Sequence, residues 1–145
     1  MPGVNLSLVK ALRRIPAFSA LDERVLLRVV GVSANLHWNH GSKVFEKGSP
    51  SEALYVVMSG AVRITDPADG GEDIIAEIEP GNFFGELSLL HEGRHSKSAY
   101  AVEDTELLVV PRDSFAQLVK QDTEFGDYMR QKVEQHRGQE VRGLT

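Results

Sequence analysis

A glycine turn followed at once by an acidic residue is the part of this chain best suited to bind a ligand. The stretch Gly85-Glu86-Leu87-Ser88-Leu89 precedes Arg94-His95-Ser96. We interpret it as a tight turn that opens a short helical turn, whose first backbone N–H groups and partial positive charge suit a phosphate. A carboxylate at that point would repel an anion unless it meets another part of the ligand, such as a sugar hydroxyl. The stretch therefore predicts a small phosphorylated ligand that carries ribose.

The rest of the sequence indicates binding rather than catalysis. It contains neither a Gly-x-Ser-x-Gly elbow nor a phosphate-binding loop with the lysine of nucleotide triphosphatases. Residues 66–71 lack the alternating ligands of a calcium loop, so we interpret them as a hairpin turn. We expect a protein that is not an enzyme and holds no metal or cofactor.

Composition and charge exclude several classes of protein. The 145 residues are 41% hydrophobic and 26% charged and include no cysteine, which is ordinary for one globular domain and excludes disulfides and thiolate metal sites. Sixteen basic and 21 acidic residues give a net charge of −5, which argues against a nucleic-acid or anionic-membrane surface. Neither a membrane-spanning run nor a secretory signal is present, so we expect a cytoplasmic protein.

Residues 36–111 carry a β-strand pattern, and this β region must position the glycine turn. Short β-like runs alternate there with turn signals rich in glycine, proline and asparagine. The runs cover residues 53–58, 61–65, 74–78 and 107–110. Strands at such short, regular intervals predict an antiparallel β-roll or jelly-roll barrel rather than βαβ units.

Helical patterns flank that β region on both sides. Residues 4–34 carry apolar residues at helical spacing, with Asp22 as an expected N-cap. Residues 112–137 return to helical spacing, and the polar tail from Gly138 is expected to fray. We predict a single domain over residues 1–145, mainly β with flanking helices: N-terminal helices, a β-roll, and C-terminal helices that act as a hinge or lid.

The order of these pieces resembles the cyclic nucleotide-binding domain family across roughly residues 12–135. The pieces that carry the resemblance are Gly48 and Pro50 in a turn, Leu54–Val57 before Ser59-Gly60, the cassette Phe84–Leu90, and Glu103–Val109. The resemblance implies a jelly-roll barrel with helices before and after it, as in catabolite-activator-type regulators, protein kinase A regulatory subunits and gated channels.

The resemblance also assigns roles to residues of the cassette. In such domains the cassette glutamate hydrogen-bonds the ribose 2′-hydroxyl, backbone N–H groups hold the cyclic phosphate, and an arginine farther along pairs with that phosphate. By motif, Glu86 takes the first role, while Gly85, Leu87 and Ser88 supply the main-chain frame. The implied ligand is cAMP in the first place and cGMP in the second.

The chain departs from the family at the phosphate-binding arginine. Aligned without a gap, the usual Pro-Arg pair falls on Arg94-His95. Arginine offers a permanent charge and a planar fork, whereas histidine offers one N–H per oxygen and is mostly neutral near pH 7 at its reference pKa of about 6.5. Losing a bidentate contact costs roughly 1.5–3 kcal/mol, about one to two decades of affinity. Arg94 itself, or Lys97 after a one-residue slip, are the conceivable replacements.

Several neighbouring residues have two interpretations. His95 either contacts the phosphate or is an exposed loop histidine in a site that no longer binds tightly. Ser96 either donates to a phosphate oxygen or is a polar residue at the start of a strand. Phe83 and Phe84 look like ligand-stacking aromatics, although core packing in a barrel strand is expected for at least one of them.

The favoured function is a stand-alone cyclic nucleotide sensor or regulatory module, in which the ligand shifts the C-terminal helices so that an unidentified protein partner reads the bound state. The alternative is an interaction or structural domain that has kept the roll and lost tight nucleotide binding. We expect no membrane contact. No helix-turn-helix follows the last helix, so we expect no nucleic-acid binding by this chain alone. We expect either a lone sensor or a fragment whose output domain was removed, and Met1 favours a natural N-terminus.

The last predicted helix also has two interpretations. Its larger apolar and aromatic residues could form a homodimer seam, or an intrachain lid that caps the purine or packs in the core. These residues are Phe125, Tyr128, Met129 and Val133.

Overall fold

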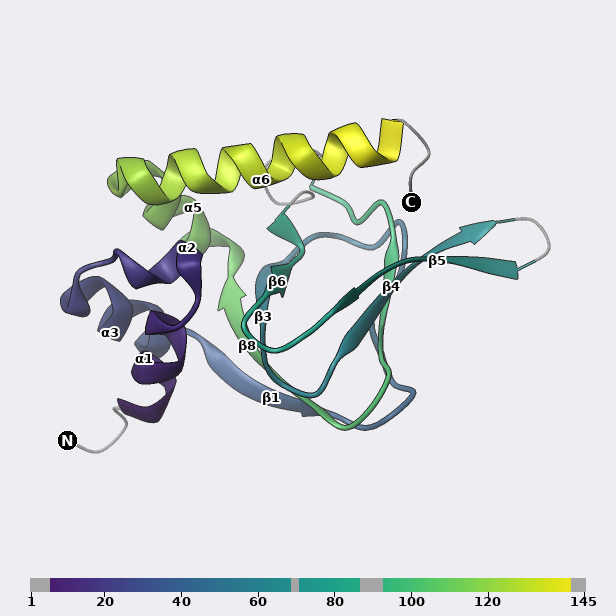
Figure 1. Ribbon diagram of the computed structural model, residues 1–145, viewed down its shortest axis with the longest axis horizontal. Helices are drawn as coiled ribbons and strands as arrows, with labels where there is room; N and C mark the ends of the chain where they lie inside the picture. Colours follow the sequence, from purple (N-terminus) through teal and green to yellow (C-terminus); the bar gives the residue numbers. More distant parts are fainter. Residues whose placement is uncertain (1–5, 69–70, 87–92, 142–145) are drawn as a thin grey trace.

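A computed structural model of the chain describes residues 6–68, 71–86 and 93–141 (Figure 1). Its strands lie, in chain order, between two groups of helices, as the patterns predict. The elements are α1 (Leu6–Arg13), α2 (Pro16–Ser19), α3 (Glu23–Val32), β1 (Ala34–Trp38), β2 (Lys43–Phe45), β3 (Ala53–Ser59), β4 (Val62–Ala68), β5 (Gly71–Ile78), β6 (Phe83–Phe84), β7 (Ser98–Ala101), β8 (Thr105–Pro111), α5 (Arg112–Gln121) and α6 (Thr123–Val141).

Over the described residues, the strands form two four-stranded sheets. The first sheet has the order β1-β8-β3-β6 and the second the order β2-β7-β4-β5. All the pairings between neighbouring strands are antiparallel, including that of β3 with β8, which lie far apart in the sequence. The prediction of an antiparallel β-roll with flanking helices is therefore confirmed.

Strand β3, inside the first sheet, is buried on both faces, which explains its unbroken apolar run. Successive side chains of a strand point to opposite faces. Tyr55 and Val57 belong to the core between the two sheets, whereas Leu54 and Val56 belong to the core between the first sheet and the helices. The sheet is therefore a shared wall between the barrel interior and the helical layer.

The helices form one packed layer on that wall. In Figure 1, α1, α2 and α3 gather at one end of the molecule, while α6 starts among the helices and extends toward the strands. Phe125 of α6 lies 5.3 Å from Phe18 of α2 and 6.1 Å from Phe115 of α5, measured between ring centroids. The predicted N-cap is confirmed, because the Asp22 side chain accepts a hydrogen bond from the Arg24 backbone N–H at 2.8 Å.

Two local predictions, a hairpin at residues 66–71 and a frayed end from Gly138, can be compared with the structure. The hairpin expected at residues 66–71 is confirmed, since β4 and β5 pair up to Ala68 and Gly71, with residues 69–70 outside the described part. The expected fraying from Gly138 is wrong, because α6 continues to Val141. A glycine inside a helix costs only about 1 kcal/mol relative to alanine, which does not end a long helix. Within the described ranges, no helix is long and apolar enough to span a bilayer.

Candidate functional site

The predicted glycine turn packs against the inner wall of the β-roll. Phe84 of β6 pairs with Tyr55 of β3, and Gly85 follows with a φ of +93°, a conformation that favours glycine. A Cβ at Gly85 would lie 3.2 Å from the Ala53 carbonyl oxygen and 3.2 Å from the Tyr55 ring. The turn therefore approaches β3 more closely than a larger residue allows.

Glu86 lies inside the protein. Its side chain is among the largest buried ones, with 2% of the residue exposed. Transfer of a carboxylate from water into a protein interior is costly unless the group is hydrogen-bonded or paired. A buried acid directly after the turn is therefore not a surface charge, and it can serve as a hydrogen-bond acceptor inside the roll. The neighbouring frame residues Leu87 and Ser88 lie outside the described residues.

His95 is also buried, so its interpretation as an exposed loop histidine is wrong. The residue is 4% exposed, and its imidazole stacks on Phe45 of β2 at 3.5 Å between centroids with a 4° angle between the rings. Its backbone N–H donates to the Ser49 carbonyl at 2.9 Å, and its own carbonyl accepts from the Gly48 N–H at 2.8 Å. These contacts hold the ring against the barrel core.

Burial determines the charge of this imidazole. Loss of solvent lowers the pKa of His95 to about 4 because the charged form is no longer hydrated. The ring is therefore neutral at pH 7. In this state one ring nitrogen donates a hydrogen bond and the other accepts one, but the ring supplies no positive charge to a phosphate.

The two conceivable replacements for the family arginine have partners of their own. Arg94 is exposed, and its Nη1 donates to the Gly48 carbonyl at 2.9 Å. Lys97 Nζ lies 3.8 Å from Asp66 Oδ2 on β4. Because neighbours in an extended segment point to opposite sides, the inward direction of His95 carries Arg94 outward. Segment 87–92, which is outside the described residues, contains no lysine or arginine in its sequence.

Aromatic rings fill the barrel beside these residues. Phe84 stacks on Tyr55 at 5.1 Å and lies 5.8 Å from Phe45, which also contacts His95. Phe84 is 4% exposed and belongs to the core between the sheets. Core packing of at least one of the phenylalanine pair is therefore confirmed, while Phe83 packs against the helical core.

The apolar residues of the last helix pack within the chain. Phe125, Met129 and Val133 are each at most 2% exposed, and Tyr128 is half-buried against the helical core. This arrangement corresponds to the intrachain alternative rather than the homodimer seam. Ser96 is half-buried between His95 and β7.

Residues 91–95 spell His-Glu-Gly-Arg-His and match the zinc-binding His-Glu-x-x-His order, so the sequence argument against metal and catalysis was wrong to count that order as absent. That motif needs both histidines on one face of a helix. Here Gly93 has a φ of +71°, Arg94 forms a β-bridge with Pro50, and His95 stacks on Phe45, so residues 93–95 are not helical. Across the described ranges, no three metal-ligating side chains form a cluster.

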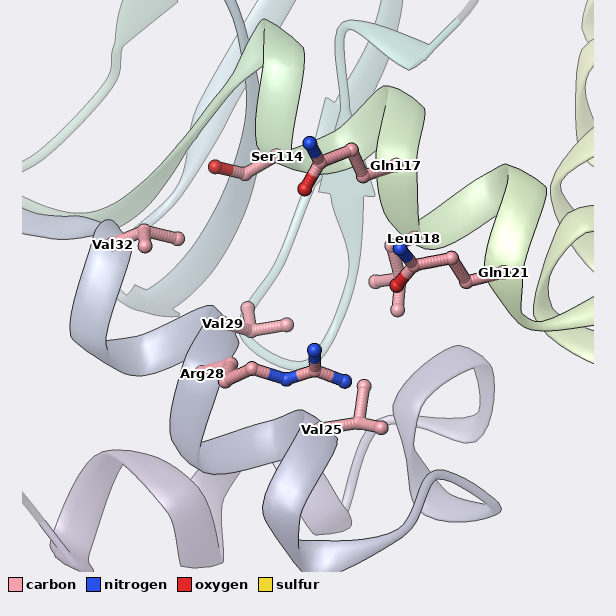
Figure 2. A pocket seen from close by; sticks show the side chains of 8 residues that line it. All are labelled: Val25, Arg28, Val29, Val32, Ser114, Gln117, Leu118 and Gln121. Atoms are coloured by element: carbon pink, nitrogen blue, oxygen red, sulfur yellow. The ribbon is translucent and has the colours of Figure 1, made fainter.

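A separate groove lies between α3 and α5 (Figure 2). Val25, Val29 and Leu118 form its apolar floor, while Arg28 and Gln121 are among its polar residues. Its volume of about 130 Å³ is below the roughly 300–1,000 Å³ of typical small-molecule sites. The groove is therefore smaller than a typical site for a ligand of nucleotide size.

The burial of His95 predicts a pH-dependent stability. The folded-state pKa of about 4 lies below the ordinary value of 6.5, so the unfolded chain takes up a proton first as the pH falls. The free energy of unfolding should therefore fall between pH 6.5 and pH 4, by up to about 3 kcal/mol from this residue. Urea titrations of the protein and of His95→Phe would measure it: the variant should lack this part of the decrease, whereas His37→Gln, at an exposed position, should keep it. Equal pH profiles for all three proteins would contradict the assignment.

Sequence comparison identifies related proteins. The sequence model of the family described as cyclic nucleotide-binding domain matches residues 36–122. The cyclic AMP receptor protein of Thermus thermophilus is 46% identical over 81 residues, which cover 55% of this chain and 38% of that protein. The chain thus spans less than two thirds of this relative's length.

Comparison of structures leads to the same architecture. The catabolite activator protein of Thermus thermophilus has a TM-score of 0.76 and 32% identity, over 89% of this chain and 61% of that one. The regulatory subunit of a cAMP-independent protein kinase A from Trypanosoma cruzi, bound to guanosine, has a TM-score of 0.81 and 21% identity, over 95% of this chain and 50% of that one. The second likeness concerns the fold alone.

Proposed function

The chain belongs to the cyclic nucleotide-binding domain family, and from this premise we propose that its β-roll binds a cyclic purine nucleotide, cAMP in the first place and cGMP in the second. Members of this family are regulatory sensor domains, so the nucleotide is a signal rather than a substrate. The Thermus thermophilus relative is named for cyclic AMP, which supports cAMP as the first ligand to test.

The buried position of Glu86 is the observation that carries this proposal. The residue follows the Gly85 turn on the inner wall of the roll and is 2% exposed. An ionised carboxylate only accepts hydrogen bonds, so it suits the donating hydroxyls of a ribose and disfavours a phosphate. Such an orientation places the ribose at Glu86 and turns the phosphate toward the main chain of the cassette.

His95 is proposed as the group that meets the phosphate. In the free protein its imidazole is neutral, because burial holds its pKa at about 4. A phosphate beside the ring stabilises the charged form and raises that pKa, so binding takes up a proton. The proposed site therefore binds a cyclic nucleotide more tightly as the pH falls, whereas a site with arginine does not depend on pH in this range.

An uncharged nucleoside is a second candidate ligand. The nearby cations Arg94 and Lys97 lie beside the Gly48 carbonyl and Asp66, and His95 is neutral at pH 7. A site in which an acid is buried and the nearby cations are held by other groups favours a ligand without a phosphate. Nucleosides are therefore tested beside cyclic nucleotides.

The output is proposed to pass through α5 and α6. Both helices pack on the layer that covers the first sheet, so a bound state of the roll can bias their position. A protein partner, or a second copy, would then distinguish the two states. The alternative function, an interaction domain without tight nucleotide binding, needs no such shift.

Isothermal titration calorimetry and thermal shift separate these functions. We expect saturable heat with cAMP at pH 6 to 7, a weaker response to cGMP, and a stabilisation of about 2.7 kcal/mol at one hundred times Kd. Stronger binding of adenosine or guanosine than of their cyclic nucleotides would favour the nucleoside. Absence of heat and of thermal shift with all four compounds at millimolar concentration would contradict binding of either ligand class. The interaction domain without tight nucleotide binding would then be the remaining function.

A further inference from the structure

Arg112 joins the start of the C-terminal helices to the segment that closes the candidate site. It is the first residue of α5 and follows directly on β8. Its backbone N–H donates to the Glu52 carbonyl at 2.9 Å, and its guanidinium Nη1 donates to the Ser51 carbonyl at 3.0 Å. A Cβ at Gly93 would lie 3.5 Å from Nη2, so the guanidinium also lies against that residue. One side chain thus contacts two segments that are distant in sequence.

Those two segments form a short ladder that ends at His95. The Ser51 N–H donates to the Gly93 carbonyl at 2.8 Å, and the His95 N–H donates to the Ser49 carbonyl at 2.9 Å. We call residues 48–51 together with 93–95 the closing ladder. Because His95 stacks on Phe45 inside the roll, any change at the proposed phosphate position acts on this ladder directly.

Helix α5, which begins at Arg112, is packed against α6 through aromatic rings. Phe115 of α5 meets Phe125 of α6 edge-on at 6.1 Å, and Phe125 packs on Phe18. The Phe125 N–H also bonds the Asp122 carboxylate at 2.9 Å, which stiffens the junction of the two helices. A displacement of the first turn of α5 is therefore passed on to α6 through packed rings rather than through a loose linker.

A buried hydroxyl shows that the junction is not fully satisfied in this arrangement. Ser51 is 1% exposed, and its Oγ has no hydrogen-bond partner among the residues that the structure describes. Nearly all buried polar groups in proteins are hydrogen-bonded. An arrangement of the closing ladder that gives this hydroxyl a partner would be favoured, so the junction has a reason to adopt a second state.

We propose that Arg112 is the positioning residue that couples the closing ladder to α5 and α6, so that ligand binding in the roll moves the C-terminal helices through it. This inference rests on the proposed function, since it requires a ligand in the roll. It assigns the coupling to one hydrogen-bonded junction with two arrangements, not to the roll as a whole. Its consequence is that coupling and affinity can be separated by mutation.

The test uses the absence of native cysteine. Cysteines are introduced at two exposed positions, Gln131 on α6 and Glu103 before β8, and are labelled with spin labels. Pulsed electron paramagnetic resonance then measures the distance between the labels with and without cAMP. We expect cAMP to shift the distance in the otherwise unchanged chain. In Arg112→Ala the shift should be lost, while calorimetry shows a Kd within about tenfold of the parent.

Two further variants make the outcome decisive. Arg112→Lys keeps the positive charge but replaces the two Nη groups with a single ammonium nitrogen, so it should show a shift between those of the parent and of Arg112→Ala. This comparison remains if the alanine variant does not fold. Arg13→Ala removes an exposed arginine paired with Glu23 on the helical layer and should keep the full shift. A full shift in Arg112→Ala or Arg112→Lys, with cAMP bound, would overturn the coupling alone. Failure of the parent chain to bind cAMP would overturn the proposed function and the coupling together.

Discussion

Glu86→Gln is expected to weaken the binding of cAMP by about 10- to 100-fold, because a charge-assisted hydrogen bond contributes roughly 1.5–3 kcal/mol. Glutamine keeps the volume of the buried side chain but lacks the charge that accepts from the ribose hydroxyl. The same substitution should weaken the binding of adenosine by a similar factor, since both ligands carry the 2′-hydroxyl. Calorimetry at one pH measures both effects.

A double-mutant cycle with 2′-deoxy-cAMP identifies the contact itself. The parent protein should lose about 10- to 100-fold in affinity when the hydroxyl is removed, whereas Glu86→Gln should lose little more. Glu79→Gln, the same substitution at an exposed position before β6, serves as the matched control and should leave both affinities unchanged. Equal losses on deoxygenation in the parent and in Glu86→Gln would show that Glu86 does not contact this hydroxyl.

His95→Arg is expected to tighten cAMP by about 10- to 100-fold at pH 7, because it replaces a neutral ring with a permanently charged, bidentate donor. The affinity for adenosine should stay within about threefold, since adenosine has no phosphate. The free variant should also be less stable than the parent, because an unpaired guanidinium replaces a ring that stacks on Phe45. Calorimetry and urea titration measure these effects.

The pH profile of the same pair tests the role of the imidazole. In the parent protein the affinity for cAMP should rise by up to about tenfold per pH unit as the pH falls below the pKa of the bound state, and level off near pH 4, where the free imidazole is itself protonated. His95→Arg should abolish this slope, and His37→Arg, at an exposed site on β1, should keep it. An unchanged cAMP affinity in His95→Arg would mean that another group holds the phosphate.

The fold could be predicted from sequence because its signals are local. Glycines with positive φ occur where the turns were expected, as at Gly48, Gly60 and Gly81, and apolar runs between them mark the strands. The continuous apolar run of β3 belongs to a strand whose two faces are both buried. The cassette glycine and glutamate lie side by side in the sequence, so their pairing also needed no tertiary information.

The direction of His95 could not be predicted in the same way. His95 faces the roll and Arg94 faces solvent because residues 93–95 pair with residues 48–51, more than forty positions away. The sequence of one segment shows that alternate side chains point to opposite sides. Which of the two alternating sets points inward depends on the distant partner segment. The histidine was therefore equally compatible with an exposed loop and with the barrel core.

The sequence alone determined that this chain is a β-roll between helices, since periodicity and turn glycines are properties of neighbouring residues. The order of its motifs, also local, carried the resemblance to the cyclic nucleotide-binding domain family and the position of Glu86 in the cassette. Only the tertiary structure decided that His95 is buried and neutral, that Arg94 points outward, and that the apolar side of α6 packs on Phe18 and Phe115 rather than being left for a second copy. Solvent exposure, and with it charge, is set by what covers a side chain, and here the covering residues come from distant parts of the chain.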